Sequence, residues 1–514
     1  MASRRVIKKR DEYFAYGSVL EAVSQGLYPD RRHILREFVQ NAYDSLADLR
    51  SRIPSARLEP VEITALAPSI VIADKGIGMS RETMRRYRYL GFSAKQLGVH
   101  AGFRGIGKFS AISACDRLIV RSSRAGESKS YQVEIDAAGM FKRLKEQRNP
   151  PLETLLQEFS HLAETQEKSD SHYTVVELHS IHDDASDLLN LPSIRPYLME
   201  TAPVPFDPNF SYGGEISDRL RQVDENFLEV PLLLNGTEVY KPFLPNAARP
   251  EFQPVFAPDS DELLAFAWSC QNVEKGQFLL ETSDGKTRRH PNSGLRYRMS
   301  NFVIGDGGLV RRTFWDSSPE RAFYFFGEVH VLDTEVVPTS DRDDFEDSSA
   351  RGRLYTACRD IAKTLNKYAA LESQQHRFVE MVAKGQDLIS ETEKELQTGS
   401  VEKELKEDKE YQIETVLQDL SKRLKQSSRN KPNKKVIQKA QSVIRKAERL
   451  KRRLKTNGPG TVQFVDISKE LRMNSGAKFV YDTVIGVLRE EFRQEPQRFR
   501  IVIRKIHQAL RQGV

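Results

Sequence analysis

The sequence predicts an α+β protein that ends in a largely helical region. In the first 180 residues, Ile34–Ser45 carries apolar residues at helical spacing, and Val61–Ala67 and Ile70–Ala73 are short apolar runs typical of strands. Residues 372–454 are strongly helical in composition and are interrupted at Pro432. A chain of 514 residues is long enough for roughly three or four domains of about 150 residues each.

The composition excludes several classes of protein. With 39% hydrophobic and 29% charged residues, the chain is typical of a soluble protein, and no apolar run approaches the roughly 20 residues that span a bilayer. The opening MASRRVIKKR lacks the apolar segment of a signal peptide, and three widely spaced cysteines exclude a disulfide framework or a Cys-rich zinc site. We therefore expect a cytoplasmic protein that does not enter a membrane.

The first of three motifs is helical. In ILREFVQNAYDS (Ile34–Ser45), apolar residues form one stripe, while Glu37, Asn41 and Asp44 recur at positions i, i+4 and i+7. This spacing places a carboxylate, an amide and a second carboxylate along one face of the helix.

The second and third motifs combine an acidic residue with glycines. VIADKGIGMS (Val71–Ser80) is an apolar run that ends in Asp74 and then turns sharply, which is how a buried strand delivers an acceptor to the edge of a pocket. GFRGIGKFSA (Gly102–Ala111) has three glycines followed by Lys108, so its backbone N–H groups can closely approach an anion such as a phosphate.

The three motifs in this order resemble the GHKL ATPase superfamily (gyrase, heat-shock chaperone, histidine kinase and MutL), over about residues 27–178. The resemblance implies a two-layer α/β sandwich with a mixed sheet that binds ATP and Mg²⁺. It implies that Glu37 is the general base, that Asn41 holds Mg²⁺ against the phosphates, and that Asp74 accepts a hydrogen bond from the adenine amino group. The further nucleotide-contacting residues that it implies are Asp44, Gly76, Gly78, Met79, Gly102, Phe103, Gly105, Ile106, Gly107 and Lys108.

Two further features follow from the same resemblance. A mobile lid is expected over about residues 91–102, and Thr174 in HYTVVEL occupies the place of a threonine that supports the adenine-binding aspartate. The glycine that precedes this threonine in the family is replaced by Tyr173. Lys108 directly follows the third glycine, and we expect it to contact a phosphate as one of the catalytic residues.

Two alternative functions for these motifs are disfavoured by the sequence. GFRGIGKFS nearly matches the P-loop pattern, but Phe109 stands where that motif needs a hydroxyl for Mg²⁺, and a P-loop would not require the other two motifs. A histidine kinase is disfavoured because no histidine lies in a dimerisation helix ahead of the ATPase motifs, and His33 is too close to Glu37 to serve.

The chain is predicted to divide into an ATP-binding domain (1–200), a second α/β or transducer domain (201–370), an antiparallel coiled-coil hairpin (371–456) and a C-terminal helical segment (457–514). Residues 139–171 are expected to form a helical insertion in the first domain. In the second, VPLLLNGTEVYKPF (Val230–Phe243) alternates around Asn235-Gly236, which is a strong hairpin signal. The order of elements in this region resembles the transducer domain of MutL-type and heat-shock-chaperone proteins.

A loop in the second domain carries an arginine, Arg342, that is a candidate for a phosphate contact. VVPTSDRDDF (Val336–Phe345) resembles the loop that reaches the γ-phosphate in the heat-shock-chaperone branch, which implies this role for Arg342. Local pairing of Arg342 with a neighbouring aspartate is the alternative for this residue. Arg312, Arg321 and Lys241 are the other candidates for the phosphate contact.

The helical region separates its charges. Residues 391–419 hold ten acidic and four basic side chains, whereas residues 429–455 hold twelve basic and one acidic. Apolar residues spaced three and four apart indicate a seam between two helices: Ile413, Leu417, Leu420 and Leu424 on the first, and Val436, Ala440, Val443, Ala447, Leu450 and Leu454 on the second. The basic helix could bind nucleic acid or face the acidic one. Two closing helices, Ser475–Phe492 and Pro496–Gln512, are candidates for a dimer interface or for docking a partner.

The sequence thus predicts an ATPase that acts as a conformational clamp, resembling heat-shock-type chaperones and working as a homodimer. The alternative is a nucleic-acid clamp of the MutL or MORC kind. The sequence does not identify a client protein.

Overall fold

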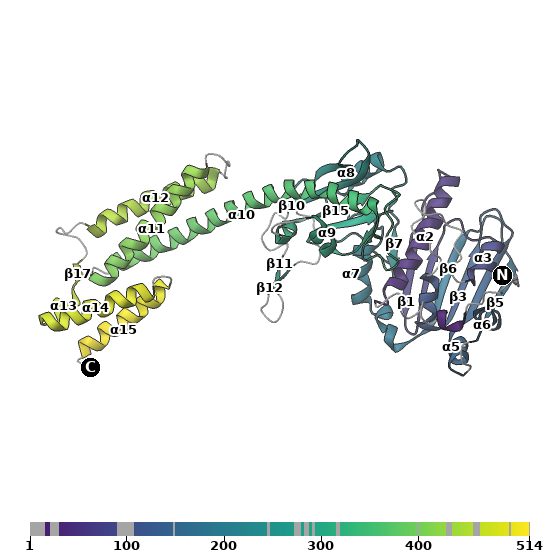
Figure 1. Ribbon diagram of the computed structural model, residues 1–514, viewed down its shortest axis with the longest axis horizontal. Helices are drawn as coiled ribbons and strands as arrows, with labels where there is room; N and C mark the ends of the chain where they lie inside the picture. The colour runs from purple at the N-terminus through teal and green to yellow at the C-terminus, as the bar shows by residue number, and fades with distance from the viewer. Residues whose placement is uncertain are drawn as a thin grey trace, which may run out of the picture. The chain divides into compact units, whose positions relative to one another are not determined.

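The computed structural model describes residues 16–20, 30–89, 107–146, 150–243, 247–271, 279–281, 287–289, 293–314, 319–397, 400–427, 434–455, 463–492 and 495–512. They belong to two compact units, Met1–Asn366 and Lys367–Val514, which are described separately (Figure 1). In the described part of the chain, no helix is both long and apolar enough to cross a membrane.

The first unit begins with a mixed sheet of eight strands in the order β5-β4-β3-β6-β2-β1-β7-β8. The strands are β1 (Val61–Leu66), β2 (Ser69–Asp74), β3 (Cys115–Ser123), β4 (Lys129–Asp136), β5 (Ser160–Gln166), β6 (Tyr173–Ile181), β7 (Leu232–Leu234) and β8 (Thr237–Glu238). All neighbours are antiparallel except β1 and β7, which run parallel.

Helices cover one face of this sheet. They are α2 (His33–Arg52), α3 (Arg81–Tyr87), α4 (Gly107–Ile112), α5 (Ala137–Glu146) and α6 (Leu152–Phe159), of which α2 packs on β2, α3 on β4, and α4 and α5 on β3. Side chains alternate between the faces of a strand, so Leu118 and Val120 enter the core while Arg121 lies on the other face and forms an ion pair with Glu177. The first domain is the expected two-layer α/β sandwich.

A serine ahead of a helical stretch predicts a helix start after Ser80, and α3 confirms it, because the Ser80 Oγ accepts a hydrogen bond from the Thr83 N–H. The prediction of a helical insertion at residues 139–171 is only partly right. Two helices occupy much of it, but Ser160–Gln166 is a strand that pairs with β4 at the sheet edge. Most of its side chains are exposed, so the apolar alternation that would reveal a strand is absent.

The predicted hairpin at Asn235-Gly236 is confirmed, with φ of 48° and 74° at its two central residues. It belongs, however, to the first sheet and not to the second. The Asn235 side chain donates to the Ala65 carbonyl oxygen at 3.0 Å and accepts from the Ala65 N–H at 2.8 Å, which fixes the turn beside β1. Turn residues specify a hairpin locally, but they carry no information about the strand on which it docks.

A second sheet of five strands follows, in the order β14-β13-β15-β10-β9. Its strands are β9 (Glu251–Phe256), β10 (Leu263–Gln271), β13 (Gly294–Met299), β14 (Phe302–Ile304) and β15 (Phe325–Val331), and β11 (Leu279–Glu281) and β12 (Thr287–Arg289) form a separate pair. Helix α8 (Gly213–Val223) packs on β10 and α9 (Gly307–Phe314) on β13. In the chain, η1 (Asp183–Leu189) leads from β6 into α7 (Leu191–Thr201), and η2 (Pro319–Tyr324) lies between α9 and β15.

A fully buried charge network joins this sheet to the first domain. The Glu328 carboxylate accepts hydrogen bonds from the Lys241 ammonium at 2.9 Å, from the Trp268 indole N–H at 3.2 Å and from the Arg298 guanidinium. Arg298 also donates to the carbonyl oxygen of Ala202, just after α7, at 3.2 Å. Burial alone would raise the pKa of Glu328, but the charges of Arg298 and Lys241 hold it well below its ordinary value.

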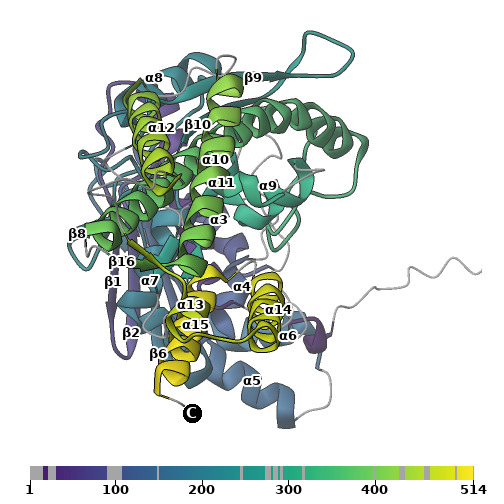
Figure 2. The same cartoon turned by 90° about the vertical axis from the view of Figure 1, so that its left-hand side faces the viewer.

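The second unit is helical. Helix α10 (Ser349–Gln397) leads into α11 (Lys403–Ser427), α12 (Lys434–Lys455), α13 (Ile467–Glu470), α14 (Ser475–Glu491) and α15 (Pro496–Gln512), and β16 (Ser400–Glu402) pairs in parallel with β17 (Gln463–Val465). Helices α14 and α15 pack against each other (Figure 2).

Helices α11 and α12 form the predicted antiparallel pair, in which the Lys451 ammonium lies 2.9 Å from the Glu414 carboxylate. The seam predicted from the heptad spacing is part of the core, since Ile413, Leu420, Ala440, Val443 and Leu450 are all buried. The core also takes Phe378, Val382, Ile389 and Leu396 from α10, so three helices share it and the hairpin does not stand alone. A supercoil in these helices stays a prediction.

Removal of the buried carboxylate should destabilise the first unit strongly. Glu328→Gln leaves two buried cations without their counter-charge, which typically costs about 3–5 kcal/mol of unfolding free energy. The matched control is Glu335→Gln, because Glu335 pairs with Arg353 at 2.9 Å while its side chain is 72% exposed, and its loss should cost about 1 kcal/mol or less. Urea unfolding of both variants compares the two effects, and equal losses of stability would contradict this account of the network.

Candidate functional site

Helix α2 carries the first predicted site residues on one face. Asp44 is buried, Glu37 is half-buried and Asn41 is exposed. The stripe therefore reaches the domain interior at Asp44 and solvent at Asn41. The helix packs against both β2 and α4. Since β2 ends in Asp74 and α4 begins at Gly107, the fold brings elements of all three sequence motifs together.

Three polar residues lie beside one another at the ends of adjacent strands. Asp74 on β2 is directly opposite Thr174 on β6, which is in turn opposite Ser122 on β3. Directly opposed residues project from the same face of a sheet, and here that face is the one covered by the helices. The Ser122 and Thr174 hydroxyl oxygens are 3.1 Å apart, and Asp74 is only 7% exposed. Three polar side chains at core-facing positions are unusual in an apolar core, so this cluster is a candidate binding site.

The turn after Asp74 is fixed on both sides. An Asp74 carboxylate oxygen accepts a hydrogen bond from the Gly76 N–H at 2.9 Å, and the Ser122 hydroxyl accepts from the Met79 N–H at 2.8 Å. A Cβ at Gly76 would lie 2.1 Å from the Ser45 hydroxyl of α2, and one at Gly78, where φ is +73°, would lie 1.9 Å from the Ser123 carbonyl oxygen. Both positions therefore need glycine, because α2 and β3 approach the turn closely.

Only part of the third motif lies within the described residues. Gly102, Phe103, Gly105, Ile106 and the expected lid over residues 91–102 fall outside them. Gly107 is the first residue of α4, and Lys108 lies in its first turn. The position of the Lys108 side chain also lies outside the described part, so its phosphate contact stays a prediction.

The departure at Tyr173 has a structural explanation. Neighbouring residues of a strand point to opposite faces, so the Tyr173 side chain projects away from the face that holds Thr174. Its hydroxyl donates to the Glu167 carboxylate at 3.2 Å, and its carbonyl oxygen accepts from the Ser122 hydroxyl at 2.8 Å. The tyrosine thus leaves the Asp74 cluster unobstructed.

Arg342 lies in a tight loop of the second domain, with φ of +60°, and is buried. A bridge between Pro338 and Phe345 closes this loop, and the Arg342 carbonyl oxygen accepts from the Gly305 N–H at 2.7 Å. Two of the rival arginines, Arg312 and Arg321, have side chains outside the described part. The prediction is wrong for the third candidate, Lys241, because its side chain is fully buried against Glu328 and does not reach a phosphate.

The Arg342 loop lies near enough to the start of α2 for charges in the two segments to affect each other's pKa values. Burial would raise the pKa of Asp341, but hydrogen bonds from the Thr339 hydroxyl and the Asp343 N–H, with a contribution from His33, hold it below its ordinary value. Burial, reinforced by the Arg36 charge, lowers the pKa of His33 to about 4. His33 is therefore neutral at neutral pH, one turn before Glu37.

A second stripe of α2 contacts the second domain. The Arg36 guanidinium donates to the Val303 carbonyl oxygen, and the Tyr43 ring packs edge-on against Phe302 at 5.3 Å between centroids. Between them, Gln40 is 0% exposed, and neither polar atom of its amide has a hydrogen-bond partner among the described residues. Residues 36, 40 and 43 are each one position before 37, 41 and 44, so the two stripes are neighbours on the same helix.

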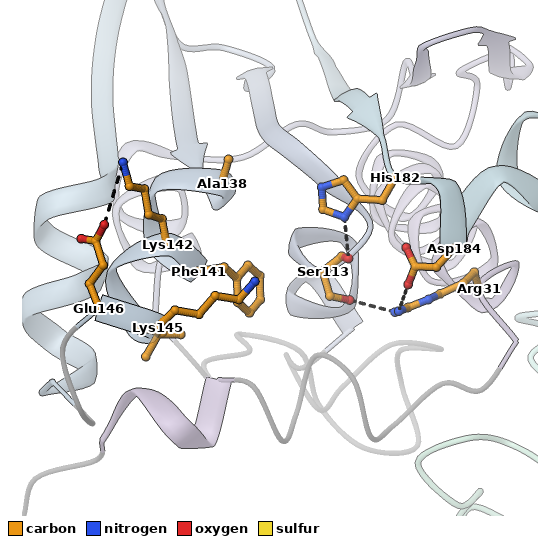
Figure 3. A pocket seen from close by; sticks show the side chains of 10 residues that line it. Arg31, Ser113, Ala138, Phe141, Lys142, Lys145, Glu146, His182 and Asp184 are labelled. Carbon is orange, nitrogen blue, oxygen red and sulfur yellow. Dashed lines mark hydrogen bonds and ion pairs between the residues drawn. The ribbon is translucent and has the colours of Figure 1, made fainter.

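A separate cavity of about 770 Å³ lies next to α5 (Figure 3). Side chains of α5, among them Phe141, Lys142 and Glu146, lie on one side, while Arg31 and His182 lie on the other. The cavity holds none of the predicted site residues. Its charged groups are largely paired, as in the Arg31–Asp184 contact of 2.8 Å (Figure 3), so we assign it no chemistry.

Two residues of this region, Ser122 and Ser45, were not predicted from the sequence. Ser122 follows Leu118 and Val120 at alternate positions of β3, so a polar residue at a core-facing position was the available signal. Ser45 is adjacent to Asp44, and its carbonyl oxygen accepts from the Ile77 N–H at 3.0 Å, which ties α2 to the glycine turn. Nothing in the sequence around Ser45 indicates this contact.

The donor set on α2 suits a hard cation. Glu37, Asn41 and Asp44 offer oxygen ligands, which Mg²⁺ prefers, and Mg²⁺ usually takes one or two protein ligands together with substrate phosphates and water. In the described part of the chain, no group of three or more His, Cys, Asp or Glu side chains could hold a metal ion by itself. The residues fit a metal that is shared with a phosphate ligand.

Two glycines offer a matched test of the turn. Both Gly78 and Gly126 have positive φ, +73° and +85°, so alanine at either position costs about 1–2 kcal/mol of backbone strain. Only at Gly78 would the new Cβ collide with backbone, since nothing lies within 4 Å of a Cβ at Gly126. We expect Gly78→Ala to lower the unfolding free energy clearly more than Gly126→Ala, as measured by urea unfolding. Equal losses would show that the turn is not held as described.

Comparison with known proteins agrees with this geometry. Residues 31–174 match the family model described as histidine kinase-, DNA gyrase B-, and HSP90-like ATPase. The chain is similar to the chaperone protein HtpG of Methylorubrum extorquens (strain PA1), with 30% identity over 161 residues, 26% of this chain and 26% of the relative. It is also similar to HtpG of Rhodospirillum rubrum, with 31% identity over 148 residues, 24% of each chain. The chain thus spans about a quarter of the length of the curated relatives it matches. Over residues 31–174, the chain is therefore similar to the ATPases of the GHKL superfamily, and the curated relatives that match this region are chaperone proteins.

Proposed function

We propose that this protein is a Mg²⁺-dependent ATPase that works as a conformational clamp of the heat-shock-chaperone type. The observation that carries the proposal is the cluster of buried Asp74 and Ser122 with half-buried Thr174, set beside a helix that bears Glu37. Because the curated relatives are matched over only about a quarter of their length, the activity of the whole chain is our inference.

The adenine end of the nucleotide is assigned to Asp74. A buried carboxylate at a strand end is a specific acceptor for an exocyclic amino group, and Thr174 and Ser122 would orient it directly or through water. Gly76, Gly78 and Met79 would form the wall beside the base. Their close packing against α2 and β3 supports a rigid pocket.

The phosphate end is assigned to α2 and the start of α4. Asn41 would hold Mg²⁺, which neutralises phosphate charge when bound, and the glycine-rich stretch with Lys108 would contact the phosphates through N–H groups and an ammonium. Asp44, which is buried, would hold the phosphate end of the site in place from inside the domain. Glu37 would orient the attacking water and accept its proton as the γ-phosphate is transferred.

Arg342 would contribute a cation to the transferred phosphate. Its loop is closed by a bridge, and the contribution of His33 to the lowered pKa of Asp341 supports a place for this loop near the start of α2 and the reacting end. A guanidinium there would distinguish ATP from ADP, because only ATP has the γ-phosphate.

Helix α2 would transmit the state of the nucleotide. One stripe faces the proposed phosphates, and the neighbouring stripe contacts Phe302 and Val303 of the second domain. An unsatisfied buried amide such as Gln40 typically costs about 1–3 kcal/mol, so we infer a second arrangement of this contact in which the amide gains a partner. ATP would favour that arrangement, close the lid and promote association of two chains.

Asp74→Asn should weaken nucleotide binding. Asn presents an amide N–H₂ where the adenine needs an acceptor, so we expect ATP affinity to fall by at least tenfold in calorimetric titration. The matched control is Asp136→Asn, because Asp136 also ends a strand and also accepts a glycine N–H at 2.9 Å. Unchanged ATP affinity of Asp74→Asn would rule out the adenine assignment.

Glu37→Ala should bind ATP normally and hydrolyse it at least a hundredfold more slowly, because general bases typically contribute factors of about 10²–10⁴. Arg342→Ala should show the same pattern, with loss of turnover and retained binding. Phosphate release and ATP titration test both variants, and light scattering should show ATP-bound dimers of Glu37→Ala accumulating. Glu158→Ala, an exposed residue of α6, is the control. Normal turnover in Glu37→Ala would remove its assignment as the base.

A further inference from the structure

The two compact units carry opposite net charges. Residues 367–514 contain 32 Lys and Arg against 20 Asp and Glu, a net charge of +12, whereas the whole chain has +7. The first 366 residues are therefore negative, at −5. The excess of positive charge is concentrated in residues 429–455, a stretch that includes the whole of α12. Such separation of charge is typical of a unit that binds a polyanion.

Helix α12 has a clear inside and outside. Its inner face is the seam of Ala440, Val443, Ala447, Leu450 and Leu454, all of which are buried. Every exposed residue of α12 that the structure describes is polar. The exposed cations are Lys435, Lys439, Arg445, Lys446, Arg449, Arg452, Arg453 and Lys455.

The neighbouring helix α11 carries both acidic and basic side chains, and its acidic ones could neutralise part of this face. Lys451 does turn toward α11, where it meets Glu414 at 2.9 Å, but its side chain is at the edge of the seam. Lys439, Lys446 and Arg449 are on the exposed side and form no ion pair with any other described residue. They are separated by seven and three positions, so they follow one face, with rises of about 10 and 5 Å along the helix axis.

We propose that this exposed face of α12, the basic face, binds the phosphate backbone of duplex DNA without sequence preference. Duplex DNA carries one negative charge per about 1.7 Å of its axis, and a helix of 22 residues is about 33 Å long, so several cations can reach phosphates at once. Each neutralised phosphate releases counterions, which provides binding free energy without apolar contact.

The composition of the basic face distinguishes DNA from other partners. A protein partner would be expected to find an apolar or aromatic core to the interface, and the exposed side of α12 offers none. Single-stranded nucleic acid is usually held by stacking on aromatic side chains, and α12 contains no aromatic residue. A purely cationic surface fits the regular backbone of a duplex. This site is independent of the proposed ATPase activity.

The test is fluorescence anisotropy of a labelled 20-base-pair duplex of mixed sequence with the full chain, from 50 to 200 mM NaCl and without nucleotide. The key variant is Lys439→Ala/Lys446→Ala/Arg449→Ala. We expect at least tenfold weaker binding at 100 mM NaCl and a slope of log affinity against log salt that is smaller by about 3, since each phosphate contact contributes about 0.9.

Two controls keep the proposal open to refutation. Lys363→Ala/Lys367→Ala/Lys384→Ala removes the same charge from exposed positions of α10 and should bind like the unaltered chain. Lys439→Arg/Lys446→Arg/Arg449→Lys should also bind normally, and circular dichroism confirms folding of each variant. Equal losses in the two alanine variants, tighter binding of single strands, or binding of a polyglutamate peptide but not of the duplex would each overturn the proposal.

Discussion

The arrangement of the first unit depends on how helix α2 is packed. Its apolar side lies in the core of the first domain, one polar stripe carries Glu37, Asn41 and Asp44, and the adjacent stripe contacts β14 of the second domain. A helix is stiff, so a shift at one stripe moves the other by a similar amount. This geometry gives the proposed chemistry and the proposed motion a common element, with no separate relay between them.

The buried network around Glu328 complements α2 at a second contact between the domains. Arg298 reaches the carbonyl oxygens of Glu200 and Ala202 at the end of α7, and Asn301 donates to the Leu228 carbonyl oxygen at 2.9 Å. The charged groups of this network are fully buried and are joined by hydrogen bonds to Glu328, so the contact is costly to break. The α2 contact, with its unsatisfied Gln40, is of a different kind. We infer that the Glu328 network holds the domains together while the α2 contact is the one that changes.

Much of the local structure could be predicted because it depends on neighbours in sequence. The Ser80 cap, the Asn235-Gly236 turn and the seam of Ala440, Val443 and Ala447 are each specified within a few residues, by hydrogen bonding, by positive φ and by helical period. Predictions that needed a distant partner were less successful. The hairpin at Asn235 joins the first sheet because Ala65, 170 residues away, accepts and donates to its amide. Strand β5 was missed because an exposed edge strand has little apolar alternation.

The sequence by itself determined the three motifs, the spacing of Glu37, Asn41 and Asp44 on one helix face, and the concentration of positive charge after residue 429. These are properties of composition and of helical periodicity, so they can be recognised without knowledge of the fold. Only the tertiary structure decided that Ser122 joins Asp74 and Thr174, that Lys241 is buried against Glu328, and that Lys446 and Arg449 lie outside the seam. Each of these depends on the register between distant segments, which is set by the packing of the whole core and not by any short stretch of the chain.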